Sequence, residues 1–219
     1  MEIELKYLIN DEDKANAIWD ELKSHPALVA ESLEEKLMHA VYFDAEDERL
    51  SKEKIAVRVR REGNEMVATC KWGGNQRKAM AEKGCDVSGA LHARSELNVP
   101  VGDDSWFVTP PSNIFGDTEI GQRIIDLLGN EPLVPILETQ FLRKLVQLHV
   151  GDMVCEVAVD LGTIEAGGRW EPICELELEL LEGESEPLME LGKSFETQYA
   201  LIPGEKSKFA RGKALRGEK

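Results

Sequence analysis

The sequence has few cysteines, no long apolar run and a shortage of positive charge. Its four cysteines, among 219 residues, include no C-x-x-C pair. This excludes a cysteine-based zinc knuckle or a dense disulfide framework and favours a reducing, cytoplasmic location. No apolar run approaches the roughly 20 residues that span a bilayer. The amino-terminal M-E-I-E-L-K lacks the basic and apolar regions of a secretory signal, so we expect neither secretion nor a membrane partner.

The charge balance is strongly acidic. Lys and Arg number 26 against 42 Asp and Glu, which gives a net charge of −16 and a pI of about 4.7. Nucleic acids and anionic membranes are bound through excess Lys and Arg, so neither is expected as a partner. A hydrophobic content of 42% excludes wholesale disorder, and the length suits one compact domain.

Alternation of polar and apolar residues, the signature of half-buried strands, recurs along the chain. It predicts eight strands, at residues 2–9, 41–44, 56–61, 65–72, 91–99, 141–150, 153–161 and 173–181. Helical periodicity is found at 12–24, between Thr118 and Gly129, and at 187–199. Residues 100–117, rich in Pro, Gly and Asp, are predicted to be a long connection. The predicted fold class is α+β.

One face of most predicted strands is charged. Successive strand side chains point to opposite faces, so Glu2, Glu4 and Lys6 share one face of the first strand. The same alternation places Arg58 and Arg60 on one face of the predicted strand at 56–61. These faces hold carboxylates and guanidinium groups with hardly any Ser, Thr or Gln. A solvated sheet face usually mixes such residues, so a face turned to water is the less favoured interpretation.

Eight such strands could instead close into a barrel with a charged lumen, covered outside by the amphipathic helices. Closure at this strand number leaves room for one small ligand and removes exposed edges. Crowded carboxylates resist ionisation unless a cation joins them, and Mg²⁺ or Mn²⁺ suits oxygen ligands. The Arg and Lys set suits an oligophosphate. The pattern therefore predicts a metal-dependent phosphate site inside a barrel.

Charged motifs follow one another in a set order along the chain. They are E-I-E-L-K at the start, V-Y-F-D, V-R-V-R, T-C-K, R-S-E, Arg143, D-L-G, E-L-E-L-E and S-K-F-A-R-G. This ordered set resembles the CYTH superfamily, also called triphosphate tunnel metalloenzymes. The resemblance implies an eight-stranded antiparallel β-barrel with a polar lumen, flanked by α-helices. It implies a CYTH triphosphate tunnel domain at 1–212, followed by a basic C-terminal tail at 213–219.

Within the superfamily, the segments around R-S-E, D-L-G and E-L-E-L-E look most like bacterial inorganic triphosphatases. The resemblance implies hydrolysis of inorganic triphosphate to pyrophosphate and phosphate by a metal-activated water. Such proteins often carry a C-terminal helical CHAD domain, so a longer parent chain could contain one. Thiamine triphosphatase, class IV adenylate cyclase and a non-catalytic polyphosphate or nucleotide binding module stay open as alternatives.

The resemblance also implies roles for individual residues. Two Mg²⁺ or Mn²⁺ ions are expected, one held by Glu2, Glu4 and Glu177 and the other by Glu96, Asp160 and Glu175. The triphosphate would be held by Lys6, Arg58, Arg60, Lys71, Arg94, Arg143 and Lys208. Glu2, Glu4 and Lys6 would form the catalytic set.

Three further positions carry smaller expectations. Glu179 is expected at the tunnel mouth more than at a metal, and Glu156 is expected to pair with a neighbouring Arg. Gly162 stands where some relatives carry a Lys, so one phosphate contact is expected to be absent or replaced.

Overall fold

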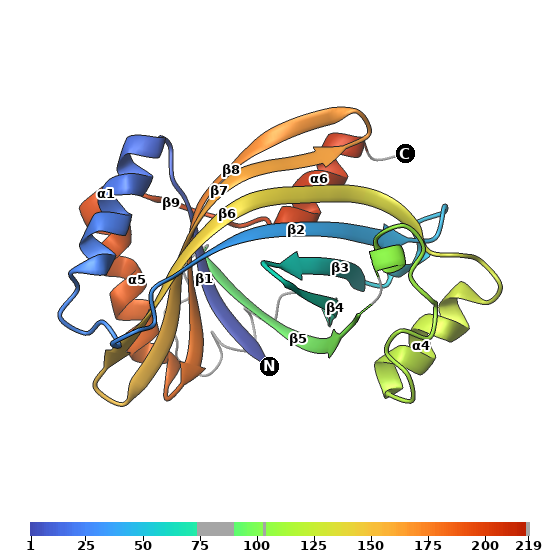
Figure 1. The fold of residues 1–219 in the computed structure, drawn as a ribbon, viewed down its shortest axis with the longest axis horizontal. Coiled ribbons are helices and arrows are strands. Elements are labelled where there is room, and N and C mark those ends of the chain that lie inside the picture. The colour runs from blue at the N-terminus through green and yellow to red at the C-terminus, as the bar shows by residue number, and fades with distance from the viewer. Residues whose placement is uncertain (74–89, 103, 218–219) are drawn as a thin grey trace.

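The computed structural model describes residues 1–73, 90–102 and 104–217. Within them, eight long strands form a closed antiparallel barrel, which confirms the predicted fold class (Figure 1). The strands are β1 (Glu2–Leu8), β2 (Glu34–Asp44), β3 (Ala56–Glu62), β4 (Glu65–Trp72), β5 (Leu91–Pro100), β6 (Val134–Val150), β7 (Met153–Ala166) and β8 (Arg169–Glu182). Their order is β5-β4-β3-β2-β6-β7-β8-β1, and pairing of β1 with β5 closes the ring. A two-residue strand, β9 (Ile202–Pro203), adds to β1.

Helices cover the outside of this barrel. α1 (Glu12–Lys23) and α5 (Ser185–Tyr199) pack on one side, where Trp19 and Phe195 join the buried Leu176 and Leu178 of β8 (Figure 1). α4 (Glu119–Leu128) packs at the opposite end with the short α2 (Arg49–Lys52). The 3₁₀ turn η1 (Asp104–Phe107) lies beside β3. Helix α6 (Lys208–Arg216) instead faces the lumen, where Lys208 and Phe209 line the cavity. Among the described residues, no helix has the length and apolar character needed to cross a bilayer.

The three predicted helices are confirmed, and their ends show why the sequence specified them. The Asp11 side chain accepts a hydrogen bond from Lys14 N at 2.7 Å, and Thr118 accepts one from Gly121 N at 3.1 Å. Gly129, with φ of 61°, ends α4 in a conformation that favours glycine. Residues 100–117, predicted as a connection, contain η1.

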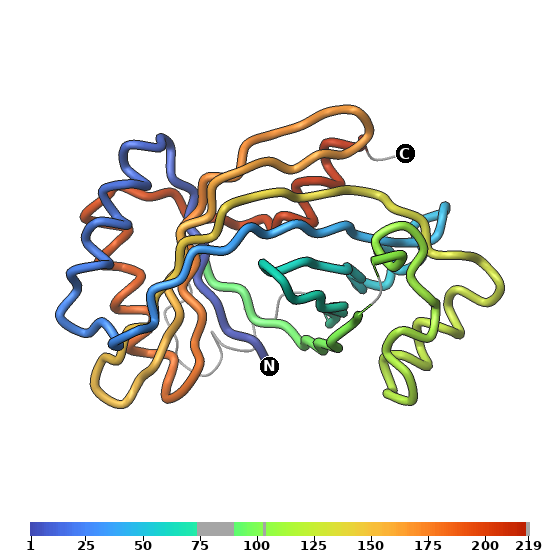
Figure 2. The backbone as a smooth tube through the Cα atoms, in the orientation of Figure 1, coloured from blue at the N-terminus to red at the C-terminus, as the bar shows by residue number. Residues whose placement is uncertain are grey.

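Helix α6 was not predicted. Its sequence is basic, and only Lys208 and Gly212 of its residues are buried, so it lacks the apolar stripe that marks an amphipathic helix. Contacts with distant segments hold it in place. Lys213 and Arg216 pair with Glu48 at 3.0 and 3.3 Å. α6 packs against β6, β7 and β8 (Figure 2). Its Phe209 lies against Tyr42, which lines the cavity, so the helix is on the lumen side.

Four strands, β2, β6, β7 and β8, are longer by five residues or more than alternation alone predicted. β2 begins at Glu34 rather than at residue 41, and β6 begins at Val134 rather than 141. The added part of β2 pairs with the second half of β6, from Glu34 opposite Leu145 to Leu37 opposite Leu142. Leu37 is 74% exposed there, so this part of the strand does not follow a buried-and-exposed pattern. This part of β2 is a strand because it pairs with β6, and a local sequence pattern cannot reveal that pairing.

Gly162 occupies the tightest backbone approach in the barrel wall. A Cβ at this position would lie 2.1 Å from the Gln140 carbonyl oxygen and 2.4 Å from the Phe141 Cα. Real Cβ atoms do not approach backbone so closely, so β6 or β7 would have to move. The wall therefore has no room for a side chain at 162, in keeping with the expected missing phosphate contact.

A first test uses this close approach. Gly162→Ala is expected to lower the free energy of unfolding by about 2–3 kcal/mol, the usual cost of overpacking a core. Urea denaturation of Gly162→Ala and of Gly102→Ala measures it. Gly102 is exposed and has no atom within 4 Å of an added Cβ, so its variant should match the wild type. Equal stability of all three proteins would show that β6 and β7 separate freely here.

Candidate active site in the barrel lumen

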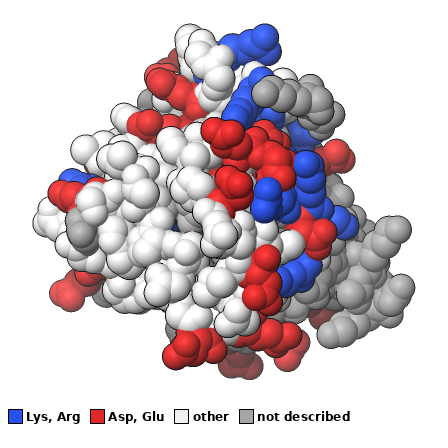
Figure 3. All heavy atoms as spheres, turned by 90° about the vertical axis from the view of Figure 1, so that its right-hand side faces the viewer, with Lys and Arg blue, Asp and Glu red and all other residues white. Residues whose placement is uncertain are grey.

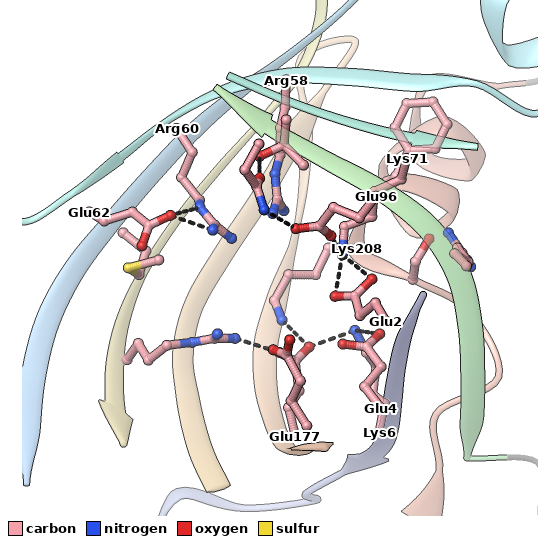
Figure 4. Close-up of a pocket in the computed structure, with 18 of the residues that line it drawn as sticks. Glu2, Glu4, Lys6, Arg58, Arg60, Glu62, Lys71, Glu96, Glu177 and Lys208 are labelled. Atoms are coloured by element: carbon pink, nitrogen blue, oxygen red, sulfur yellow. Dashed lines mark hydrogen bonds and ion pairs between the residues drawn. The ribbon is translucent and has the colours of Figure 1, made fainter. Parts of the chain in front are cut away.

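The charged faces of the strands do turn inward. They surround a cavity of about 290 Å³, and Figure 4 shows their side chains pointing into it from opposite walls. Every predicted site residue except Asp160 and Glu175 lines this cavity. Those two are fully buried in the wall beside it and bond to Lys208, which does line it. The lumen therefore brings the predicted site residues into one place.

A cluster of three carboxylates lies at the α6 side of the cavity. Oxygen atoms of Asp160, Glu175 and Glu177 all lie within 4.8 Å of one another. Lys208 Nζ donates to all three, at 2.8, 2.6 and 2.8 Å. Arg143 also donates to Asp160, at 2.7 and 2.8 Å, and to Glu177. This cluster is thus balanced by cations of the protein itself.

The ion pairs decide the protonation of Glu177. Burial alone would raise the pKa of this carboxyl, but Lys208, Lys6 and Arg143 together lower it well below its ordinary value. Lys6 Nζ lies 2.6 Å from a Glu177 oxygen. Conversely, the carboxylates raise the pKa of Lys208 well above its ordinary value, although burial opposes this. All these groups are therefore charged at neutral pH.

A second group of carboxylates surrounds Lys71. Its Nζ lies 2.7 Å from Glu2 and 2.7 Å from Glu96. Burial would raise the pKa of Glu96, but Lys71 and Arg58 lower it to about 2. Burial raises the pKa of Glu2, and the charge of the nearby Glu4 raises it further. Lys71 lowers it, but by less, so the pKa of Glu2 is raised overall.

Glu179 lies between these two groups and has no ion pair among the described residues. It lies opposite Glu4 in the pairing of β1 with β8. Burial, together with the charges of Glu2 and Glu4, raises the pKa of Glu179 to about 7. Glu4 differs, because burial would raise its pKa but Lys6, 3.8 Å away, and the other nearby cations lower it. Glu2 and Glu179 therefore have raised pKa values, and Glu4 does not.

Two guanidinium groups of the lumen are incompletely hydrogen-bonded. Arg58 and Arg94 each have a buried Nε with no hydrogen-bond partner among the described residues. Arg58 donates to the Tyr42 hydroxyl at 3.1 Å, and Arg94 lies 3.5 Å from His92 Nδ1. Neither is in an ion pair within the described ranges. Buried charges need a partner, and two unpartnered guanidinium groups in one cavity favour an anionic ligand.

The structure groups the predicted metal ligands differently from the expected two sets. Asp160 and Glu175 lie together as expected, and Glu177 is their third neighbour. Glu96 lies instead beside Glu2, on the other side of Lys71. Figure 4 shows Glu96 and Glu2 on the same side of the pocket, with Glu177 across from them.

Sequence reasoning missed two residues that act at the site. Glu62 pairs with Arg60, and strand parity could have found it because it continues the face of Arg58 and Arg60. Arg211 pairs with Glu175 from helix α6, which no strand pattern reveals. His92 was predicted by parity to hydrogen-bond on an inner face, and its Nε2 donates to the Gly204 carbonyl at 2.7 Å. The predicted pairing of Glu156 with an Arg is present, at 3.9 Å from Arg143.

Charged side chains are unevenly spread over one face of the molecule. On the face seen in Figure 3, Lys and Arg side chains lie among Asp and Glu side chains toward one side. A broad area beside them carries no charged residue.

A closed barrel with interleaved cations and carboxylates in its lumen defines an anion-binding tunnel protein with an acidic cluster that could hold a metal ion. The chain belongs to the CYTH domain family, whose sequence profile matches residues 1–212. It is 29% identical over 174 residues to an inorganic triphosphatase of Haemophilus influenzae, a match that covers 80% of this chain. The same match covers 44% of that relative, so the chain spans less than half of its length.

Solved structures share the fold. A putative adenylyl cyclase from Hippeastrum, described as having a dominant triphosphatase activity, superposes with a TM-score of 0.68 at 19% identity, covering 98% of this chain and 96% of that one. A putative adenylate cyclase from Bacillus halodurans gives a TM-score of 0.57 at 17% identity, covering 94% and 95%. These likenesses establish the tunnel fold.

Proposed function

We propose that this chain hydrolyses inorganic triphosphate to pyrophosphate and phosphate inside the barrel, with Mg²⁺ or Mn²⁺ as cofactor. One observation carries the proposal: Arg58 and Arg94, whose buried Nε atoms have no hydrogen-bond partner among the described residues, share a cavity with the carboxyls of Glu2 and Glu179, whose pKa values are raised. In the barrel wall Glu2 is the direct neighbour of Arg94. A phosphate chain bound with a divalent cation supplies the charges that both groups lack.

The donor set fits hard divalent cations. Carboxylate oxygens are the ligands that Mg²⁺ and Mn²⁺ prefer, and the raised pKa values of Glu2 and Glu179 mark carboxylates that need a cation. We assign Glu2 and Glu4, with Glu96 beside Glu2, to one ion, and Asp160, Glu175 and Glu177 to the other. When bound, such an ion would lower the pKa of a water molecule and polarise a phosphoryl oxygen.

The protein's own cations would hold the substrate. Seven residues are assigned to the triphosphate: Lys6, Arg58, Arg60, Lys71, Arg94, Arg143 and Lys208. Planar guanidinium groups bind phosphate oxygens in pairs and stabilise the charge that develops on them. A covalent route through a thiol is disfavoured, because burial raises the pKa of Cys70 and Cys155 to about 12.

The parent protein is also part of the proposal. The Haemophilus relative is more than twice as long as the matched region. We propose that a CHAD domain follows this barrel in a longer chain, and that the protein acts in the cytoplasm on triphosphate-bearing small molecules.

A substrate panel tests the proposal. Phosphate or pyrophosphate release is measured from tripolyphosphate, thiamine triphosphate and ATP, each with Mg²⁺, with Mn²⁺ and with a chelator. We expect tripolyphosphate to be hydrolysed fastest, and the chelator to abolish the reaction. Faster turnover of thiamine triphosphate, or cyclic AMP formed from ATP, would assign one of the alternative activities. Tight tripolyphosphate binding without turnover under any metal would indicate a binding module.

A further inference from the structure

Glu62 is a carboxylate that no substrate or metal assignment uses. It is the last residue of β3, on the lumen face that also carries Arg58 and Arg60. Its oxygen accepts a hydrogen bond from Arg60 Nε at 2.6 Å and also pairs with Arg60 Nη2. Figure 4 shows this pair on the opposite side of the pocket from Glu2. The two side chains are 16% and 23% exposed, so the pair is largely shielded from solvent.

The surroundings of Arg60 explain the need for this partner. Burial lowers the pKa of Arg60, and so do the neighbouring charges of Arg58 and Arg143. Glu62 acts in the other direction. Arg60 therefore already has a carboxylate partner in the protein, in contrast to Arg58 and Arg94, whose Nε atoms lack a partner among the described residues. Of the four arginines that line the lumen, Arg60 is thus less available to an anion than Arg58 and Arg94.

We propose that Glu62 weakens the binding of phosphate chains by competing with them for Arg60. This inference rests on the proposed function, and concerns how tightly that site holds its substrate and product. An anion reaches Arg58 and Arg94 directly, but it reaches Arg60 only by displacing a shielded carboxylate. A long, highly charged phosphate chain gains enough from the other cations to do so. Once the chain is shortened, Glu62 regains Arg60 and opposes retention of the product.

The test removes the charge of Glu62 and keeps its shape. Glu62→Gln is expected to lower the KM for tripolyphosphate, and the inhibition constant of pyrophosphate, by about tenfold. The second comparison is made without Arg60. The double variant Glu62→Gln/Arg60→Gln should have a KM and an inhibition constant within about twofold of those of Arg60→Gln alone. This dependence on Arg60 separates competition from a general effect of removing one negative charge.

Asp104→Asn is the matched control. Asp104 pairs with Arg61, the next residue along β3, at 2.5 Å on the outside of the barrel, and its side chain is 78% exposed. Its removal should leave both constants unchanged. A raised KM in Glu62→Gln would show that Glu62 positions Arg60 rather than competing for it, and an unchanged KM would show that Glu62 does not compete with the substrate; either result overturns the inference. A wild-type protein that neither binds nor hydrolyses tripolyphosphate overturns the proposed function itself.

Discussion

Glu4→Gln is expected to lower metal-dependent phosphate release from tripolyphosphate by about a thousandfold, an effect of the size caused by removing one group that stabilises transition-state charge. Glu4 lies in the cavity opposite Glu179, and its ion pair among the described residues is with Lys6, 3.8 Å away. The amide keeps the shape of the side chain but contributes no charge to a metal ion. Phosphate release with Mg²⁺ and with Mn²⁺ measures the effect, and thermal unfolding checks that the fold survives.

The control for this prediction is Glu165→Gln. Glu165 lies on β7, as Glu156 and Asp160 do, but its side chain is exposed. Its variant should keep wild-type turnover. If Glu4→Gln turned over at the wild-type rate, the assignment of Glu4 to a metal would be wrong.

Strand alternation predicted the lumen because side-chain direction in a strand is a local property. Arg58, Arg60 and Glu2 could be placed on inward faces before any pairing was known, and they line the cavity. The same rule fails where a strand leaves the barrel. His149 follows the parity of Arg143, which places it on the inner face, yet it is exposed next to the β6–β7 turn at Gly151.

Partners within the site could not be predicted, because they depend on how distant elements meet. Lys208 was expected to hold the substrate, and it lies on helix α6, which brings its ammonium group onto Asp160, Glu175 and Glu177. Glu96 was grouped with Asp160 from motif order, while register places it opposite Lys71. Periodicity predicts the face of the sheet on which a side chain lies. Strand register and helix packing decide which residues that side chain contacts.

Lys208→Met is expected to lower the free energy of unfolding at pH 7 by about 3–5 kcal/mol, the usual cost of removing one partner from a buried ionic cluster. Lys208 is 6% exposed and donates to three carboxylates, two of them fully buried. Methionine fills a similar volume but leaves these carboxylates with Arg143, Arg211 and Lys6 as their remaining cations. Urea denaturation measures the loss. Lys193→Met, which removes an exposed pair with Glu196, should cost less than about 1 kcal/mol.

The dependence of this loss on pH follows from the direction of the pKa shift. The pKa of Glu177 is lowered in the folded state, so its ion pairs stabilise the wild type above the ordinary value of 4.5, and this contribution fades as pH falls through the lower folded value. Without Lys208 the carboxylates take up protons at higher pH, which relieves their repulsion. The stability difference between wild type and Lys208→Met should therefore be largest near pH 7 and shrink below pH 4.5. Mg²⁺ should stabilise the variant more than the wild type, because it can replace the missing positive charge among the three carboxylates. A difference that stayed constant with pH and with Mg²⁺ would assign the loss to packing around Lys208 rather than to charge.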